Sequence, residues 1–352
     1  MRPGGGTYTG PVPGDSEQST VPGPAPAPRR LHDDLGRRLP DFFIVGHQKC
    51  GTTALYRMLQ DHPQIYMPAE KEPRFLIDEL KAVPREGKPT KRPATIEQYL
   101  ELFAPASAEQ RAGEASPQYL RYPEVPPKIA ELQPGAKIIV LLREPASFLR
   151  SFHGQMLHNR IETEKDFRRA MELEPARRRG ERVPRGVRRV AWLLYSDHVR
   201  YVEQLERFYA CFAAEQILVL IYEDYRRDNE AVVRQVLRFL EIDDSRPVEP
   251  VDTNPLKDVR IQPLHHLTAQ MQEARRNPAA VSAPVRALDA LVPERMRDLL
   301  GSAWRQVIYR PRAEPDPAFL RELRRRFKPE VEAAGEFLGR DLVALWGYDE
   351  LD

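Results

Sequence analysis

The fold is decided by residues 40–53, which read PDFFIVGHQKCGTT. The apolar run from Phe42 to Val45 has the length of a buried strand, and it ends at Gly46. A short loop follows, and a helix is expected to begin at Thr52. This strand–loop–helix order brings unpaired backbone N–H groups and the positive end of a helix dipole to one point. Such a point is a site for an anion.

The side chains of this loop suit a phosphate. Gly46 and Gly51 allow the backbone to approach it closely, and Lys49 provides a positive charge. Thr52 and Thr53 provide hydroxyl donors. In a Walker A loop the lysine comes immediately before the Ser/Thr whose hydroxyl holds magnesium. Here the lysine lies in the middle of the loop, so the spacing differs from that of the magnesium-dependent NTPases.

Cys50, in the same loop, leaves two interpretations open. A thiol at a helix N-terminus can have a lowered pKa, but we favour a small residue that simply fits the loop. Cys50 and Cys211 are the two cysteines of the chain, too few for a disulfide framework. Such cysteine usage suits a reducing compartment.

A second strong pattern lies at residues 137–153, which read KIIVLLREPASFLRSFH. The aliphatic run is typical of a central strand buried on both faces, and Arg143 stands at its carboxyl end. Pro145 suits the first turn of a helix, and Ser151 lies about two turns into that helix. A planar guanidinium and a hydroxyl that converge on one anion form a phosphate clamp.

The order Gly-x-x-Lys-x-Gly-Thr-Thr at residues 46–53 resembles the 5′-phosphosulfate loop of the sulfotransferases that use 3′-phosphoadenosine 5′-phosphosulfate (PAPS). Those enzymes carry Arg-x-Pro-x-x-Arg-x-x-Ser where this chain has residues 143–151. Their Arg and Ser bind the 3′-phosphate, and the matching residues are Arg143 and Ser151. The middle Arg is replaced by Phe148. Arg150 either supplies that charge from a neighbouring position or faces solvent.

The resemblance also implies the ligand and its contacts. The donor would be PAPS and the product adenosine 3′,5′-bisphosphate, with no metal required. Lys49 would neutralise charge on the departing 5′-phosphate. Many members place a basic loop over the 3′-phosphate, for which Lys257 and Arg260 are candidates. The implied contacts in the first loop are Gly46, Gln48, Lys49, Cys50, Gly51, Thr52 and Thr53.

The acceptor side is indicated by residues 68–75, PAEKEPRF, which follow the second predicted strand. Charges next to prolines on a loop are usually solvated, but this loop is expected at the carboxyl edge of the sheet, where ligands bind. In the heparan-type and related bacterial sulfotransferases, a Lys-Glu loop here contains the general base. The resemblance assigns that role to Glu72 and places Lys71 beside the sulfuryl group.

A weaker match at residues 113–119, GEASPQY, resembles the Glu-x-(Ser/Thr)-Pro-x-Tyr segment that helps to shape the acceptor pocket of the same family. It makes Glu114 and Tyr119 candidates for substrate contact, although Tyr119 equally fits a core aromatic. The densely basic residues 173–190 are expected to form a solvated loop. Alternatively, they form a mobile lid whose arginines screen PAPS or an anionic acceptor.

Length and composition set the remaining limits. A chain of 352 residues can bury a sizeable core, and a formal net charge of +2 gives no global field for nucleic acid. Residues 1–38, rich in Pro, Gly and Ser, are predicted to be a disordered tail, and residues 39–352 a single domain. With no secretory signal pattern and no long apolar run, we expect a cytoplasmic protein without a membrane span.

Strands at 42–45, 64–67, 137–142 and 217–222 alternate with helices. This order predicts an α/β three-layer fold of the P-loop type, with a mainly parallel sheet and a helical C-terminal part. The function implied is transfer of a sulfuryl group from PAPS to a hydroxyl acceptor, most often on a carbohydrate or glycoconjugate. Two alternatives stay open: a P-loop kinase or NTPase, and a catalytically silent nucleotide-binding protein.

Overall fold

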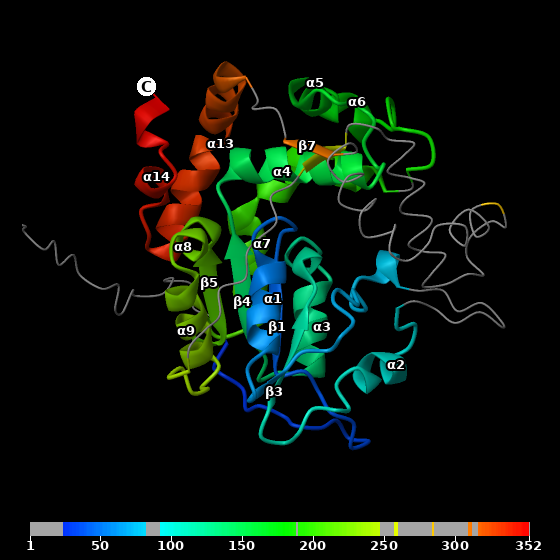
Figure 1. Ribbon diagram of the computed structural model, residues 1–352, viewed down its shortest axis with the longest axis vertical. Helices are drawn as coiled ribbons and strands as arrows, with labels where there is room; N and C mark the ends of the chain where they lie inside the picture. The colour runs from blue at the N-terminus through cyan, green and yellow to red at the C-terminus, as the bar shows by residue number, and fades with distance from the viewer. Residues whose placement is uncertain are drawn as a thin grey trace, which may run out of the picture. The chain divides into compact units, whose positions relative to one another are not determined.

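Five parallel strands form the central sheet, in the order β2-β3-β1-β4-β5 (Figure 1). β1 lies in the middle, between β3 and β4, and leads directly into the loop for which the sequence predicts phosphate binding. The predicted α/β fold with a mainly parallel sheet is confirmed. The strands are β1 (Phe42–Gly46), β2 (Ile65–Tyr66), β3 (Arg111–Ala115), β4 (Lys137–Leu142) and β5 (Ile217–Ile221).

The chain divides into two compact units. The first comprises residues 1–148, 196–252 and 321–352 and contains the sheet, and the second comprises residues 149–195 and 253–320. The computed structural model describes residues 24–81, 92–187, 189–246, 257–259, 284, 309–311 and 316–351.

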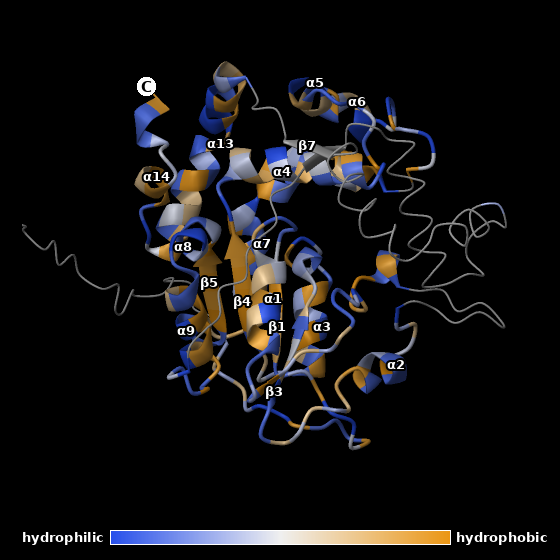
Figure 2. Ribbon diagram, in the orientation of Figure 1, coloured by the Kyte–Doolittle hydropathy of each residue, from blue (hydrophilic) through white to orange (hydrophobic). Residues whose placement is uncertain are grey.

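The sheet forms where the sequence is apolar on both faces of a strand. β4 and β5 read KIIVLL and ILVLI and are hydrophobic along most of their length (Figure 2). β3, which reads RAGEA, was not among the predicted strands because it lacks β-branched and aromatic residues. Its Gly113 is required, since a Cβ atom there would lie 2.2 Å from the ring of Phe42 on β1.

Helices cover the sheet in the first unit (Figure 1). α1 packs on β1 and β2, and α9 packs on β5. No helix in the described part of the chain is both long and apolar enough to cross a membrane. The helices of this unit are α1 (Thr52–Gln60), α2 (Ile96–Glu101), α3 (Val125–Leu132), α7 (Tyr201–Tyr209), α8 (Tyr222–Arg227), α9 (Asn229–Phe239), most of α13 (Pro317–Leu338) and α14 (Leu342–Leu345).

The second unit contains most of α4 (Pro145–His158), together with α5 (Phe167–Glu172) and α6 (Glu174–Arg178). Its β6 (Lys257–Val259) and β7 (Tyr309–Pro311) pair antiparallel. The basic segment expected as a solvated loop instead includes α6, and its Arg177 is buried. The guanidinium of Arg177 donates to both carboxylate oxygens of Glu162, at 2.7 and 2.8 Å, which explains how a charge can be buried there.

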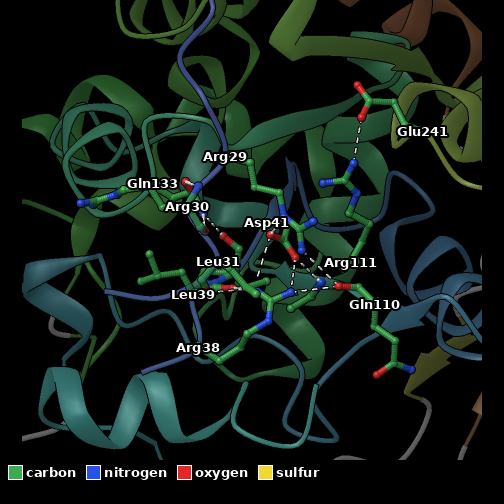
Figure 3. Close-up of polar contacts among 12 residues, drawn as sticks. Arg29, Arg30, Leu31, Arg38, Leu39, Asp41, Gln110, Arg111, Gln133 and Glu241 are labelled. Carbon is green, nitrogen blue, oxygen red and sulfur yellow. Dashed lines mark hydrogen bonds and ion pairs between the residues drawn. The ribbon is translucent and has the colours of Figure 1, made fainter. Parts of the chain in front are cut away.

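The buried carboxylate of Asp41 stabilises the amino end of β1 (Figure 3). Asp41 is 3% exposed and forms ion pairs with Arg29 and Arg38, the latter at 2.6 Å. It also accepts the backbone N–H of Ala112, at 2.7 Å, and so joins β1 to β3. Both arginines come from the segment that the sequence assigns to the tail, so the packed part of the chain begins before residue 39.

Candidate active site

The loop after β1 has the backbone conformation that its glycines predict. Gly46 has a φ of 140°, and a Cβ atom there would lie 2.4 Å from the carbonyl oxygen of Leu141 on β4. Lys49 has a φ of 73°, which a residue with a side chain rarely adopts. Backbone strain of this kind is typical of ligand-binding loops.

The loop ends at the N-terminus of α1, where Gly51 is the cap residue with a φ of 88°. Gly51 has no side chain with which to cap the helix. Thr52 is buried and Thr53 is exposed at this first turn. The helix end therefore keeps its dipole and donors available for an anion.

The loop contains two buried polar groups, the Cys50 thiol and the Gln48 amide, and they have different roles: the first packs in the core and the second can bind a ligand. Burial raises the pKa of the Cys50 thiol to about 12, so the interpretation with a lowered pKa is wrong and the packing interpretation holds. Gln48, by contrast, has a buried side-chain oxygen with no hydrogen-bond partner among the described residues. Because a 180° rotation of the amide exchanges its oxygen and its NH₂ group, this side chain can offer either an acceptor or a donor to a ligand.

Arg143 lies directly beside this loop. It follows Leu142, the last residue of β4, and its Nη1 donates to the carbonyl oxygen of Lys49 at 2.7 Å. Its Nε and Nη2 donate to Ser147 Oγ at 3.1 and 2.6 Å. The two strongest patterns of the sequence therefore meet at one place in the fold.

Tyr222 completes the surroundings of Arg143. Leu142 pairs with Ile221 in the sheet, so the residues that follow these two strand ends are neighbours. The guanidinium of Arg143 lies 4.5 Å from the centre of the Tyr222 ring. Among the described residues, no carboxylate forms an ion pair with Arg143, and its hydrogen-bond acceptors are a hydroxyl and a carbonyl. Burial raises the pKa of Glu223 and the charge of Arg143 opposes that rise, so Glu223 compensates part of this charge and the rest is available to a bound anion.

Glu72 lies on the loop after β2, at the same edge of the sheet. Its backbone N–H donates to the carbonyl oxygen of Ala115, the last residue of β3, at 3.1 Å. Its carboxylate forms ion pairs with Lys71, at 2.9 Å, and with Arg74. Burial raises the pKa of Glu72, but the charges of Lys71 and Arg74 outweigh it, and the net result is a lowered pKa. The carboxylate is therefore ionised near neutral pH and can accept a proton.

This loop is held in an unusual conformation by β3 and the turn after it. Glu72 and Arg74 have φ values of 62° and 56°. The N–H of Arg74 donates to Ser116 Oγ at 3.1 Å, and the N–H of Leu76 donates to the Tyr119 hydroxyl at 3.2 Å. These bonds hold the backbone that follows Glu72, while Lys71 and Arg74 hold its carboxylate.

Glu114 anchors the hydroxyls behind the loop. It is 1% exposed and accepts from Tyr99 at 2.5 Å and from Tyr119 at 3.1 Å. Burial raises its pKa to about 7, while the hydroxyls of Ser116 and the two tyrosines oppose that rise. Glu114 and Tyr119 thus lie inside the protein, behind the Glu72 loop.

Other predicted site residues are placed less directly. Ser151 lies on α4 in the second unit, whereas Ser147, one turn earlier, contacts Arg143. Lys257 is described only as part of the backbone of β6, and Arg260 lies outside the described residues. Phe148, which replaces the family arginine, is fully buried with its ring centre 4.8 Å from that of His47.

The sequence analysis did not identify Ser147 or Tyr222 as neighbours of Arg143. A usable signal was present for both. Ser147 is four residues after Arg143, in the first turn of the helix that follows it. Tyr222 comes directly after β5, the strand next to β4. Side chains four apart on a helix face the same way, and adjacent parallel strands end at the same edge.

A family model described as "Sulfotransferase family" matches residues 40–246. The chain belongs to the sulfotransferase family. The match covers β1 through β5 and both ends of the proposed site, and the resemblance found in the sequence is confirmed at the level of the family.

Similar proteins agree with this family. Human bifunctional heparan sulfate N-deacetylase/N-sulfotransferase 3 is 28% identical over 212 residues, covering 58% of this chain and 22% of that protein. Human heparan sulfate glucosamine 3-O-sulfotransferase 5 is 31% identical over 138 residues, covering 39% of this chain and 36% of that protein. The chain therefore spans only about a fifth to a third of these relatives.

A solved structure extends the likeness beyond the family model. The sulfotransferase from Alicyclobacillus acidocaldarius superposes with a TM-score of 0.52 at 28% identity. The superposition covers 76% of this chain and 99% of that one.

Proposed function

We propose that this sulfotransferase transfers a sulfuryl group from PAPS to a hydroxyl of a carbohydrate or glycoconjugate. The observation that carries the proposal is the 2.7 Å hydrogen bond between Arg143 and the carbonyl oxygen of Lys49. It joins the loop suited to the 5′-phosphosulfate to the arginine suited to the 3′-phosphate. A single nucleotide with phosphates at both positions fits such a pair of sites.

The donor side needs cations and N–H donors at two points. Lys49, the loop amides and Thr53 would bind the 5′-phosphosulfate at the N-terminus of α1. Arg143, with Ser147 and Ser151, would bind the 3′-phosphate. Binding energy at the 3′-phosphate then positions the sulfuryl group without taking part in the chemistry. None of these roles requires a metal.

The transfer step can be written with the chain's own groups. The bond between sulfur and the bridging oxygen of the 5′-phosphate breaks, and its electron pair stays on that oxygen beside Lys49. A bond forms between sulfur and the acceptor oxygen, whose proton passes to the Glu72 carboxylate. Lys71, paired with Glu72, would lie beside the sulfuryl group. Glu114 and Tyr119 would act on the acceptor only through the loop that they support.

The choice of a carbohydrate acceptor is supported by the curated relatives, whose names refer to heparan sulfate. The acceptor site is formed by loops, and loops differ among relatives more than the sheet does. The donor half of the proposal is therefore tested first and the acceptor second.

The first experiment measures the melting temperature of the full chain with adenosine 3′,5′-bisphosphate in EDTA, and with ATP plus magnesium. The bisphosphate alone should stabilise the protein, by about 3 kcal/mol at a hundredfold excess over Kd. Stabilisation by ATP with magnesium and not by the bisphosphate would instead identify a P-loop kinase or NTPase.

The second experiment incubates the protein with ³⁵S-labelled PAPS and a panel of polysaccharides, phenols and lipids. Label should transfer to a carbohydrate in the presence of the wild type and not of Glu72→Gln. Bisphosphate binding with no transfer to any member of the panel would favour a catalytically silent nucleotide-binding protein.

A further inference from the structure

Besides the carbonyl oxygen of Lys49, the Arg143 side chain contacts Ser147 and Tyr222, and each of these two residues lies close in the chain to a buried or half-buried carboxylate. Ser147 lies in the first turn of α4, which is capped by Glu144: the carboxylate accepts the N–H groups of Ala146 at 3.1 Å and Ser147 at 2.6 Å. Tyr222 is followed by Glu223, whose Oε1 accepts the N–H of Glu144 at 3.3 Å. The positions of Ser147 and Tyr222 thus depend on two carboxylates.

Both carboxylates are held by residues 340–348, a segment that lies outside the family match. Trp346 Nε1 donates to Glu223 at 2.9 Å, and the Tyr348 hydroxyl donates to Glu144 at 2.7 Å. Arg340 forms an ion pair with Asp224, the residue after Glu223. The segment therefore contacts both the start of α8 and the residue that caps α4.

The backbone of residues 340–348 places the side chains of Trp346 and Tyr348 against these two carboxylates. α14 ends at Leu345, Trp346 is its C-cap, and Gly347 has a φ of 67°, which reverses the chain as glycine does at many helix ends. The N–H of Tyr348 then donates to the carbonyl oxygen of Val343 at 2.8 Å. As a result Trp346 and Tyr348 are 4% and 0% exposed, and their polar atoms reach the two carboxylates.

We propose that residues 340–348 position Arg143 for the 3′-phosphate, with Trp346 and Tyr348 as positioning residues that do not touch the nucleotide. The inference rests on the proposed function, because it takes Arg143 to be the 3′-phosphate ligand. It adds a determinant of donor selectivity: the segment should favour a nucleotide with a 3′-phosphate over one without it. A segment that served only general stability would weaken both nucleotides alike.

The test compares Kd for adenosine 3′,5′-bisphosphate with Kd for adenosine 5′-phosphate, by calorimetric titration of the full chain. The variants are Trp346→Phe, Tyr348→Phe and, as a reference, Arg143→Ala. The matched control is Tyr66→Phe, which also removes a tyrosine hydroxyl from a hydrogen bond, 3.0 Å to Leu102, but on the opposite edge strand of the sheet.

We expect Arg143→Ala to weaken bisphosphate binding by about 10- to 100-fold, and Tyr348→Phe and Trp346→Phe by about 5- to 10-fold. Binding of adenosine 5′-phosphate should stay within about twofold of wild type in Tyr348→Phe and Trp346→Phe, and Tyr66→Phe should match wild type for both nucleotides.

Two results would overturn the inference, and they differ. A wild type that binds both nucleotides equally well would overturn the proposed function and this inference with it. A wild type that prefers the bisphosphate, with the same preference in Tyr348→Phe, would overturn this inference alone. Tyr348→Phe keeps the buried ring, so it decides the question even if Trp346→Phe does not fold.

Discussion

Two carboxylates at opposite ends of the sheet, Asp41 and Glu72, are each held by two basic side chains. Asp41, before β1, pairs with Arg29 and Arg38. Glu72, after β2, pairs with Lys71 and Arg74. Asp41 is 3% exposed, whereas the Glu72 side chain is 20% exposed on a backbone with a φ of 62°.

The difference shows that ion pairing alone does not identify a site. At the amino end of β1 the carboxylate also accepts a backbone N–H of β3, so the group contributes to the fold. At the carboxyl edge the carboxylate is reachable by solvent, and its strained backbone has to be supported by neighbouring hydroxyls. Four substitutions test whether Asp41 serves the fold and Glu72 serves catalysis.

The largest effect is expected for Glu72→Gln. Loss of a general base should lower kcat by about 10²- to 10⁴-fold, while bisphosphate binding and the melting temperature stay near wild type. Initial rates with labelled PAPS and a calorimetric titration measure the two quantities. Full activity in this variant would show that Glu72 is not the general base.

Asp41→Asn should give the opposite result. It leaves the buried Arg38, 5% exposed, without its counterion, so the free energy of unfolding should fall by about 3 kcal/mol. At a temperature where the variant is folded, kcat should be that of wild type. Glu230→Gln, which breaks a surface pair with Arg234 (2.8 Å), is the control and should cost less than about 1 kcal/mol. A large fall in kcat of the folded variant would contradict a purely structural role for Asp41.

Glu114→Gln tests the support behind Glu72 through the pH dependence of stability. Burial raises the pKa of Glu114 to about 7 in the folded chain, from an ordinary value of 4.5. Between these values the folded state binds more protons than the unfolded state, so this group's contribution to stability falls as pH rises. Glutamine does not titrate, so the variant does not lose stability in this way. The free energy of unfolding of Glu114→Gln minus that of the wild type should therefore rise by about 1–3 kcal/mol from pH 5 to pH 8. Denaturant unfolding at both pH values measures it, and a pH-independent difference would contradict it.

The smallest effect is expected for Arg74→Ala. The charges of Lys71 and Arg74 lower the pKa of Glu72, so removal of one of them should raise that pKa. Activity depends on the ionised carboxylate, so the acid limb of the pH–kcat profile should move to higher pH. Arg169→Ala, which removes a cation paired with the exposed Glu172 (3.1 Å), is the control and should leave the profile unchanged. An unmoved limb in Arg74→Ala would argue against Glu72 as the base.

The central strands and the phosphate loop could be predicted from the sequence because each is encoded by contiguous residues. The aliphatic runs of β4 and β5 and the glycines at 46 and 51 need no knowledge of distant parts of the chain. β3 could not be predicted in this way, because the fit of Gly113 against the Phe42 ring exists only once the strands pair.

Charged residues were predicted less well than apolar ones. Arg177 lies in a run that is arginine-rich and looks solvated, yet it is buried against Glu162, fifteen residues away along the chain. Ser147 and Tyr222 likewise acquire their place beside Arg143 from the register of two strand ends. A partner brought near by folding leaves no local trace in the sequence.

The burial of Cys50 has a practical consequence. Alkylating reagents and peroxide attack the thiolate, and a thiol with a pKa of about 12 is almost entirely protonated at neutral pH. The loop around it is therefore protected from oxidation as long as it stays closed. The rate at which a maleimide modifies Cys50, with and without bound nucleotide, would then report how often this loop opens.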